Sequence, residues 1–364
     1  MRNAEQFGGE VGMSRDEVEA VAAHYDIGVI RSVKVIDRGS AAHLKVVIRA
    51  SRGDYLLKRR PGTEAALGRI REIHELHRRL SEASFAIAPL RALVSKGDGG
   101  TYLVMDGALY EMMQFIRGKS FEGSSEGAWA AGEMLSEFHH CVASMKPPGN
   151  REVLARSYHD QGDVIDQMGA GAVSAVRARL AESGREEECG RVEETVDMLV
   201  RSYKAASARV EVEGFYRWPR MIVHGDWHPG NMVYRTGGEI AAVLDLDSMR
   251  FEPRATDVAN GAFQFSMRAV GNDPRDWPDS VDEVRLTAFC SGYDAKYGEV
   301  KLSLPEVRAL PWLMIEALVA ESLAPVAVAG IFHNIGGAEF LAMVERKVRW
   351  LRDHAGRIVY LLGE

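Results

Sequence analysis

The stretch His224-Gly225-Asp226-Trp227-His228-Pro229-Gly230-Asn231 sets a carboxylate and an amide five residues apart in one short loop. Fourteen residues after Asn231, Asp245 closes the apolar run 240–244, and Asp247 follows two positions later. Transfer of a phosphoryl group from ATP needs these side chains: one carboxylate orients and deprotonates an acceptor hydroxyl, while an amide oxygen and another carboxylate hold Mg²⁺ against the phosphates. The stretch therefore predicts a loop that supports phosphoryl transfer.

The composition indicates a soluble globular protein. The chain has 364 residues, which is enough for two domains or two lobes with a large buried core. Apolar residues make up 46% and charged residues 27%, and the net charge of −7 gives nucleic-acid binding no electrostatic support. The longest apolar region, 312–332, contains Glu316, Glu321 and Pro325, which favours buried helices over a membrane span.

The cysteines and the N-terminus favour a cytoplasmic protein. Cys141, Cys189 and Cys290 are far apart and odd in number, which favours reduced thiols over a disulfide framework or a zinc site. The polar N-terminus has no apolar core of a signal peptide. We therefore expect a cytoplasmic protein without a nucleic-acid or membrane partner, whereas the sequence leaves the oligomeric state unknown.

Residues 1–116 predict a β-rich lobe that also contains two helices. A capping box at Ser14-Arg15-Asp16-Glu17 begins a short helix over 14–25, and apolar residues at three- and four-residue steps predict an amphipathic helix over 64–80. The expected strands are 33–37, 44–49, 55–59, 101–105 and 108–115, with Asp106-Gly107 as the hairpin turn between the last two.

Residues 117–364 predict a larger lobe that is mainly helical. The expected helices cover 128–142, 173–208, 310–329 and 341–351, where 173–208 contains one helix or two. The exception is a central hairpin with strands at 221–223, 232–234 and 240–244 and a turn at Thr236-Gly237-Gly238. The predicted fold class is therefore α+β, with the chemistry on the short hairpin of the larger lobe.

The pattern H-G-D-x-x-x-x-N, followed by a strand ending in D-x-D, resembles the aminoglycoside phosphotransferase and choline kinase superfamily, whose fold is protein-kinase-like. His224, Gly225, Asp226, Asn231 and Asp245 match this pattern without a gap. Within the superfamily the chain looks most similar to the branch of type II homoserine kinases, spore-coat kinase-like proteins and stress-response kinases. The resemblance covers roughly 33–257 and implies a small antiparallel nucleotide-binding lobe followed by a helical lobe that binds the acceptor.

The resemblance also implies roles for the loop residues. Asp226 would be the catalytic base, or the group that orients the acceptor hydroxyl, and Asn231 would act with it. Asn231 and Asp245 would bind Mg²⁺ as hard oxygen donors. Asp247 would either approach a second metal ion or cap the next turn. His228 would brace the loop or contact the substrate.

The same resemblance implies a nucleotide site in the first lobe. Lys58 on the third strand would reach the α- and β-phosphates of ATP, held by a glutamate of the following helix; Glu72 fits best by spacing, and Glu75 is the alternative. Gly39 and Ser40 take the place of the loop that covers the phosphates.

The resemblance further implies residues that bind adenine and residues that support the catalytic loop. The main-chain carbonyl of Gln114 and the N–H of Ile116 would hydrogen-bond adenine. Asp257 would tie the catalytic loop to a helix, and the default role of His139 and His140 is packing.

A metal-dependent hydrolase is an alternative of another class. His224, Asp226 and His228 form an H-x-D-x-H pattern that can bind zinc. This interpretation leaves Asn231 and Lys58 without a role.

Two kinase-like alternatives also stay open. One is a pseudokinase that binds nucleotide without turnover. The other is a protein Ser/Thr kinase of the stress-response type, although only ten residues separate Asp247 from Asp257, which leaves little room for an activation segment. We expect an ATP- and Mg²⁺-dependent phosphotransferase acting on a small-molecule hydroxyl, with the acceptor chosen by helices within 173–208 and 310–332.

Overall fold

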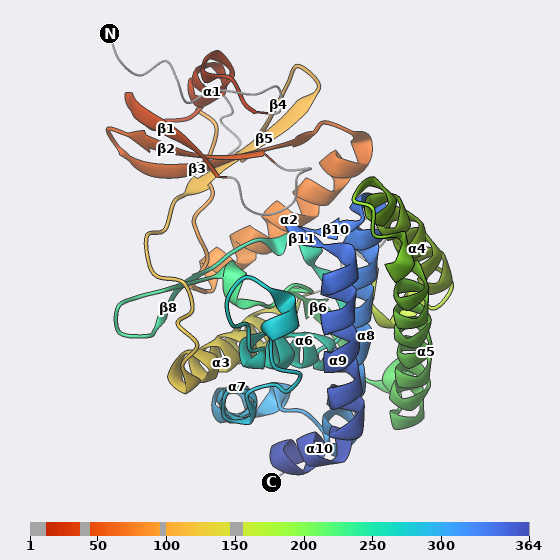
Figure 1. Cartoon of the computed structure of the whole chain (residues 1–364). Helices are drawn as coiled ribbons and strands as arrows, with labels where there is room; N and C mark the ends of the chain where they lie inside the picture. The colour runs from red at the N-terminus through yellow and green to blue at the C-terminus, as the bar shows by residue number, and fades with distance from the viewer. Residues whose placement is uncertain (1–11, 37–43, 95–99, 146–155, 364) are drawn as a thin grey trace. The chain divides into compact units, whose positions relative to one another are not determined.

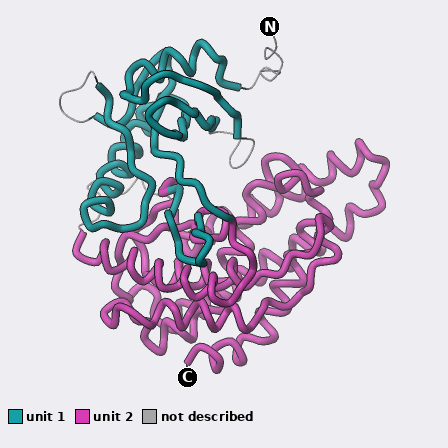
Figure 2. Tube along the Cα trace, turned by 90° about the vertical axis from the view of Figure 1, so that its left-hand side faces the viewer, with its two compact units in different colours: residues 1–119, 233–245 teal, residues 120–232, 246–364 magenta. Residues whose placement is uncertain are grey.

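The computed structural model describes residues 12–36, 44–94, 100–145 and 156–363, and its helices and antiparallel sheet confirm the α+β class (Figure 1). The chain divides into two compact units (Figure 2). Unit 1 contains residues 1–119 and 233–245, and unit 2 contains residues 120–232 and 246–364. The segment 233–245 thus joins the N-terminal part of the chain, although it follows the His224–Asn231 loop in sequence.

A five-stranded antiparallel sheet forms the centre of unit 1, in the order β1-β2-β3-β5-β4. Its strands are β1 (Ile30–Ile36), β2 (Leu44–Ala50), β3 (Gly53–Pro61), β4 (Tyr102–Met105) and β5 (Ala108–Gln114), and the helices of this unit are α1 (Arg15–Ala22) and α2 (Glu64–Glu82). Asp106 and Gly107 have φ of 50° and 73°, the two positive values of a type I′ turn, so the predicted hairpin is confirmed. Ser14 caps α1 as predicted, and its hydroxyl accepts a hydrogen bond from Glu17 N at 3.1 Å.

The two faces of this sheet differ in character. Val46 on β2 and Leu57 on β3 are buried and pack with α1 in an apolar core. Because neighbouring residues on a strand point to opposite faces, Lys45, Lys58 and Glu111 share the other face. The register sets Lys45 directly opposite Lys58, and Lys58 directly opposite Glu111. The strand pairing therefore builds a row of charged side chains on the face away from α1.

A short ladder connects the C-terminal part of unit 1 to its sheet. Its strands are β7 (Met232–Tyr234) and β8 (Ile240–Val243), which pair with each other. Val243 N donates to Ala86 O at 2.8 Å, and Val243 forms a parallel bridge with Ile87. These main-chain contacts hold the end of β8, and with it the adjoining Asp245, within unit 1.

Unit 2 consists mainly of helices. They are α3 (Ser125–Val142), α4 (Ile165–Glu182), α5 (Cys189–Glu213), α6 (Ala255–Ser266), α7 (Glu283–Lys296), α8 (Leu304–Ala329), α9 (Gly337–Asp353) and α10 (Ala355–Gly363). Two short ladders accompany them, β6 (Arg220–Val223) with β9 (Arg250–Pro253) and β10 (Ile331–Phe332) with β11 (Ile335–Gly336). The predicted region 173–208 is thus part of two helices, α4 and α5.

The strand β6 does not belong to the central hairpin that the sequence predicts. It pairs with β9, a strand that sequence reasoning missed, and only β7 and β8 pair with each other. Periodicity shows that a segment is extended but gives no information on its partner. The pairing of β6 with β9 brings the residues before His224 next to those that lead into α6.

The apolar helix α8 is the core helix of unit 2. Among the described residues it is the one helix long and apolar enough to cross a membrane by length and composition. Of its most apolar window, 61% is buried within the protein, because α4, α5, α6 and α9 pack around it. This burial agrees with the predicted buried helices.

Candidate active site

One buried carboxylate holds the start of the His224–Asn231 loop. Asp257 on α6 accepts hydrogen bonds from the main-chain N–H groups of His224 at 2.7 Å and Gly225 at 2.8 Å. His139 Nε2 on α3 lies 3.2 Å from the same carboxylate. Burial would raise the pKa of Asp257, but the bond to His139, the charges of His139 and His224 and the Gly225 N–H lower it overall. Asp257 is therefore ionised and anchors the loop, the role that the resemblance implies.

Two further residues restrict the loop to one conformation. Gly225 has φ of 78°, and a Cβ there would lie 2.1 Å from Ser248 O, so a side chain does not fit. Trp227 is buried, and its indole N–H donates to Ala131 O of α3 at 3.2 Å. These contacts fix the backbone on both sides of Asp226, whose side chain remains 38% exposed.

Asp226 and Asn231 meet across the loop. Asn231 Nδ2 donates to Asp226 O at 3.0 Å and to Asp226 Oδ2 at 3.1 Å, and His228 Nε2 lies 3.5 Å from the same Oδ2. Burial would raise the pKa of Asp226, but the bond and charge of His228, the charge of His224 and the bond from Asn231 lower it below its usual range. Asp226 is therefore a carboxylate at neutral pH, and it can accept a hydrogen bond from an alcohol.

The amide of Asn231 is oriented so that its oxygen can bind a cation. Because Nδ2 donates to Asp226, Oδ1 is the end of the amide that can act as a metal ligand. Asn231 is buried, and its two hydrogen bonds to Asp226 hold the amide in this orientation. An amide oxygen is a hard donor of the kind that Mg²⁺ prefers.

The histidines of the loop do not form a zinc site with Asp226. His224 is fully buried, and its Nδ1 accepts the N–H of Asp226 at 3.3 Å. Its ring lies edge-on to Phe138 and Trp227. Within the described ranges, no group of three or more His, Cys, Asp and Glu side chains is arranged to hold a metal ion. This geometry makes His224 a bracing residue.

In unit 1, one carboxylate receives two lysines. Lys58 Nζ lies 3.2 Å from Asp245 Oδ1, and Lys45 Nζ lies 3.2 Å from Asp245 Oδ2. Asp245 has φ of 62°, a left-handed conformation that is uncommon outside glycine and recurs at functional sites. Lys58 thus contacts the carboxylate that the resemblance makes a metal ligand, and Lys45 is a second cation that the sequence analysis missed.

Glu111 is a buried acid that the sequence analysis also missed. It accepts a hydrogen bond from Arg60 Nε at 3.0 Å, and its Oε2 lies 2.8 Å from His74 Nε2 on α2. Burial would raise the pKa of Glu111, but the charge of Arg60, the bond to His74 and the charge of Lys58 lower it to about 2. Glu111 lies opposite Lys58 because β3 pairs with β5, a pairing that the sequence does not predict.

The two glutamates predicted as partners of Lys58 lie on α2. Glu72 is half-buried, and its role stays a prediction. Glu75 is near the surface and accepts hydrogen bonds from Arg78 and Arg79. Its pKa is lowered to about 2, chiefly by these two bonds.

Two of the remaining predicted nucleotide contacts, Gln114 and Ile116, lie at or just after the end of β5. Gln114 is exposed and ends β5, and its N–H donates to Pro89 O at 2.8 Å. Ile116 is half-buried and follows the strand. Gly39 and Ser40 lie outside the described residues. The roles of all four in binding the nucleotide stay predictions.

Two glutamates of α8 have different surroundings. Glu316 is buried, and its Oε1 lies 2.8 Å from His159 Nδ1, so it is part of the core of unit 2. Glu321 is half-buried and accepts hydrogen bonds from Asn260 Nδ2 at 3.0 Å and Gln264 Nε2 at 3.3 Å. Burial raises the pKa of Glu321, a hydrogen bond with Tyr158 lowers it, and the negative charge of Asp226 raises it further, so that the pKa is raised overall. Glu321 is therefore a held carboxylate near the catalytic loop.

A model of the phosphotransferase enzyme family matches residues 32–302, which is most of the chain. The chain therefore belongs to this family, and it is a kinase that transfers a phosphoryl group to an alcohol group. No curated protein matches the chain by sequence.

Several solved structures share the two-lobe kinase-like fold. An aminoglycoside phosphotransferase from Alicyclobacillus acidocaldarius subsp. acidocaldarius DSM 446 is 16% identical, with a TM-score of 0.61 over 93% of this chain and 96% of that one. The amicoumacin kinase hAmiN, solved with AMP-PNP, Ca²⁺ and Ami, is 13% identical, with a TM-score of 0.63 over 93% of each chain. A microcompartment-associated aminopropanol kinase is 12% identical, with a TM-score of 0.68 over 95% of this chain and 98% of that one. At these identities the likeness shows the fold, which is the predicted one.

Proposed function

We propose that this chain is a cytoplasmic, ATP- and Mg²⁺-dependent kinase that transfers the γ-phosphate to a hydroxyl of a small molecule. The observation that carries the proposal is the pair of Asp226 and Asn231, 3.1 Å apart on a loop anchored by Asp257 in a member of the phosphotransferase enzyme family. Structures of similar fold hold AMP-PNP or ADP, which supports a nucleotide as phosphate donor.

The first lobe, residues 1–116, binds the nucleotide in this proposal. Lys58 contacts the α- and β-phosphates, and the loop with Gly39 and Ser40 covers them. The main chain of Gln114 and Ile116 binds adenine. The buried position of Lys58 supports its role, because a lysine ammonium is rarely buried without a partner of opposite charge.

Asn231 and Asp245 are the residues that would hold Mg²⁺. Both offer oxygen donors, and the half-exposed carboxylate of Asp245 already contacts two cationic groups, so the donor set suits a hard cation. When bound, the metal ion neutralises charge on the phosphates of the donor. The protein contributes the fixed position of these oxygens.

Asp226 acts on the acceptor. Its carboxylate accepts the hydrogen bond of the acceptor hydroxyl and aligns the hydroxyl oxygen with the γ-phosphorus. As the new O–P bond forms, the bond between the γ-phosphorus and the β,γ-bridging oxygen breaks, ADP leaves with that oxygen, and Asp226 takes up the hydroxyl proton. Because the pKa of Asp226 is lowered, orientation of the hydroxyl precedes proton removal, which suits a loose transfer step. His228, beside Asp226, keeps this carboxylate in place.

Glu321 favours an acceptor that carries a cationic amine. Asn260 and Gln264 hold its carboxylate. Burial raises the pKa of Glu321 most, a bond with Tyr158 lowers it, and the like charge of Asp226 raises it further. An ammonium group of the acceptor would relieve the repulsion between these two carboxylates. We therefore infer that the acceptor is an amino alcohol, bound by residues within 117–364.

The direct test is an ADP-release assay with Mg·ATP across amino alcohols, neutral sugars and homoserine, preceded by thermal shift with Mg·ATP. We expect Mg·ATP to raise Tm and amino alcohols to release ADP. Nucleotide binding without ADP release from any acceptor would support a pseudokinase. Phosphorylation of a generic protein in a radiolabel assay would support a protein kinase instead.

The variant Glu321→Gln tests the choice of acceptor. We expect KM for an active amino alcohol to rise roughly 10- to 100-fold, the range for one lost charge-assisted hydrogen bond, with KM for ATP unchanged. Glu316→Gln is not a suitable control because Glu316 is part of the core. Glu182→Gln, at the exposed end of α4, is the matched control. An unchanged acceptor KM in Glu321→Gln would remove Glu321 from the acceptor site.

A further inference from the structure

Lys45 faces a residue of the same charge across two neighbouring strands. It lies on β2 directly opposite Lys58 on β3, on the same face of the sheet. Like charges directly opposite on neighbouring strands repel each other and destabilise a sheet. Here one carboxylate, Asp245, lies 3.2 Å from each ammonium group and offsets one of the two positive charges.

The other acid on this row, Glu111, forms its hydrogen bonds with other residues, although the charge of Lys58 also acts on it. Glu111, opposite Lys58, is buried and bonds to Arg60 and His74. The carboxylate of Asp245 is therefore the one that Lys45 and Lys58 share. If Asp245 helps to hold a divalent cation, as proposed above, its carboxylate is shared with that cation, and Lys45 needs another acceptor for its ammonium group.

An anion with several oxygens can accept hydrogen bonds from Lys45 and from Lys58 at the same time. Their ammonium groups approach the two oxygens of one carboxylate, so their spacing suits an anion of that size, such as a phosphate group. The side chain of Lys45 is 17% exposed and that of Lys58 is 5% exposed, so Lys45 is the more accessible of the two.

We propose that Lys45 is a second phosphate-binding residue, which contacts the triphosphate of the nucleotide together with Lys58 and exchanges Asp245 for that contact when the metal-bound nucleotide enters. This inference rests on the proposed function. It assigns a residue on β2 to a task for which the sequence analysis considered Lys58 alone.

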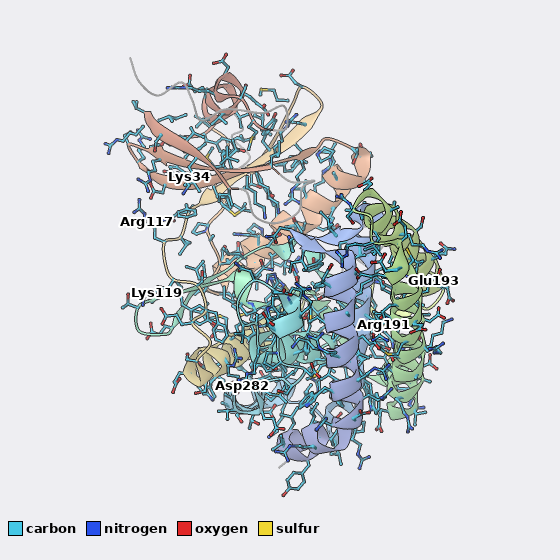
Figure 3. All side chains as sticks on the ribbon, viewed as in Figure 1. Lys34, Arg117, Lys119, Arg191, Glu193 and Asp282 are labelled. Carbon is cyan, nitrogen blue, oxygen red and sulfur yellow. The ribbon has the colours of Figure 1, made fainter. Side chains whose placement is uncertain are left out.

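Isothermal titration with Mg·ATP and with adenosine tests the assignment in the full chain. We expect Lys45→Met to weaken Mg·ATP binding roughly 10- to 100-fold and to leave adenosine binding within about twofold, because adenosine has no phosphate. Lys45→Arg should restore most of the lost affinity, since the charge returns. Lys34→Met is the matched control: Lys34, labelled in Figure 3, is an exposed lysine on β1 of the same sheet.

Two other outcomes of the titration would contradict the role proposed for Lys45. Equal loss of ATP and adenosine affinity in Lys45→Met would make Lys45 a structural residue, and unchanged ATP affinity would remove it from the site. If Lys45→Met does not fold, Lys45→Gln is titrated in its place, and its ratio of ATP to adenosine affinity is decisive. Absence of Mg·ATP binding by the wild-type protein would overturn the proposed function itself, whereas wild-type binding with an unaffected variant overturns only the role of Lys45.

Discussion

The catalytic loop of unit 2 and the charged row of unit 1, with the Asp245 that contacts it, position their functional side chains in different ways. In the loop, Asp226 and Asn231 are five residues apart and contact each other through local geometry. In the row, strand register sets Lys45 opposite Lys58, and Asp245, which is 200 and 187 residues away in the chain, contacts both lysines. The first arrangement is visible as a motif, and the second becomes visible only when strands are paired.

The difference also affects how each region tolerates change. The loop depends on single contacts that have no substitute, such as the bonds to Asp257 and the space for the hydrogen atom of Gly225. The row is a network in which each charge has more than one neighbour. We therefore expect large effects from substitutions in the loop and graded effects from substitutions in the row.

The largest expected effect is on turnover. Asp226→Asn removes the carboxylate that orients the acceptor, and we expect kcat to fall ~10²- to 10⁴-fold with ATP affinity retained. Steady-state kinetics with titration of Mg·ATP measures both quantities. Asp276→Asn, an exposed aspartate outside the site, is the matched control. Near-normal turnover in Asp226→Asn would mean that the loop motif does not identify the base.

Substitution of Asp257, which anchors the catalytic loop, should lower the free energy of unfolding. Asp257→Ala leaves the N–H groups of His224 and Gly225 without their acceptor in a buried place, together with the His139 side chain. We expect the free energy of unfolding to fall by about 3–5 kcal/mol, the range for loss of one partner of a buried charged pair. Urea unfolding measures it, with Asp276→Ala as control. A loss below about 1 kcal/mol would show that other contacts hold the loop.

A smaller effect is expected in the charged row. Glu111→Gln keeps the shape but removes the charge that faces Arg60 and His74, so we expect a loss of about 1–3 kcal/mol in the free energy of unfolding. Glu75→Gln, on the exposed face of α2, should cost less than about 1 kcal/mol because solvent screens its ion pairs. Equal losses in the two variants would contradict the network described for Glu111.

The pH dependence of stability sharpens this test. The pKa of Glu111 is lowered from 4.5 to about 2, so its contribution is fully present above pH 4.5 and is lost as the pH falls towards 2. The difference in unfolding free energy between wild type and Glu111→Gln should therefore be constant near neutral pH and shrink below pH 4.5. A difference that grows on acidification would mean that Glu111 is not the stabilised carboxylate.

Several features could be predicted from residue patterns because their causes are local. The Asp106-Gly107 turn follows from the positive φ that a two-residue hairpin needs, and Ser14 begins α1 because its hydroxyl accepts a main-chain N–H. The matched residues of the loop also indicated the phosphotransferase family, which the family model confirms over 32–302. The branch within that family stays a prediction.

Other features could not be predicted, because partners far apart in the sequence decide them. Extended residues at 221–223 gave no sign that their partner would be β9. Glu111 lies within a mainly apolar strand, and its ionic contacts depend on Arg60 of β3 and on His74 of α2, which the strand pattern does not reveal. The position of the Glu321 carboxylate is set by hydrogen bonds from Asn260 and Gln264 of α6, which are distant in sequence.

The sequence by itself therefore determined the reaction class, because a base, an amide ligand and a second acid at fixed short spacings are sufficient to define phosphoryl transfer. Only the tertiary structure decided which charges accompany them. Strand register placed Lys45 beside Lys58, and the main-chain contacts of Val243 with Ala86 and Ile87 placed Asp245 at both lysines. Helix packing placed the carboxylate of Glu321 within the electrostatic influence of Asp226. Electrostatic interactions act through space and not along the chain, so these neighbours follow from folding.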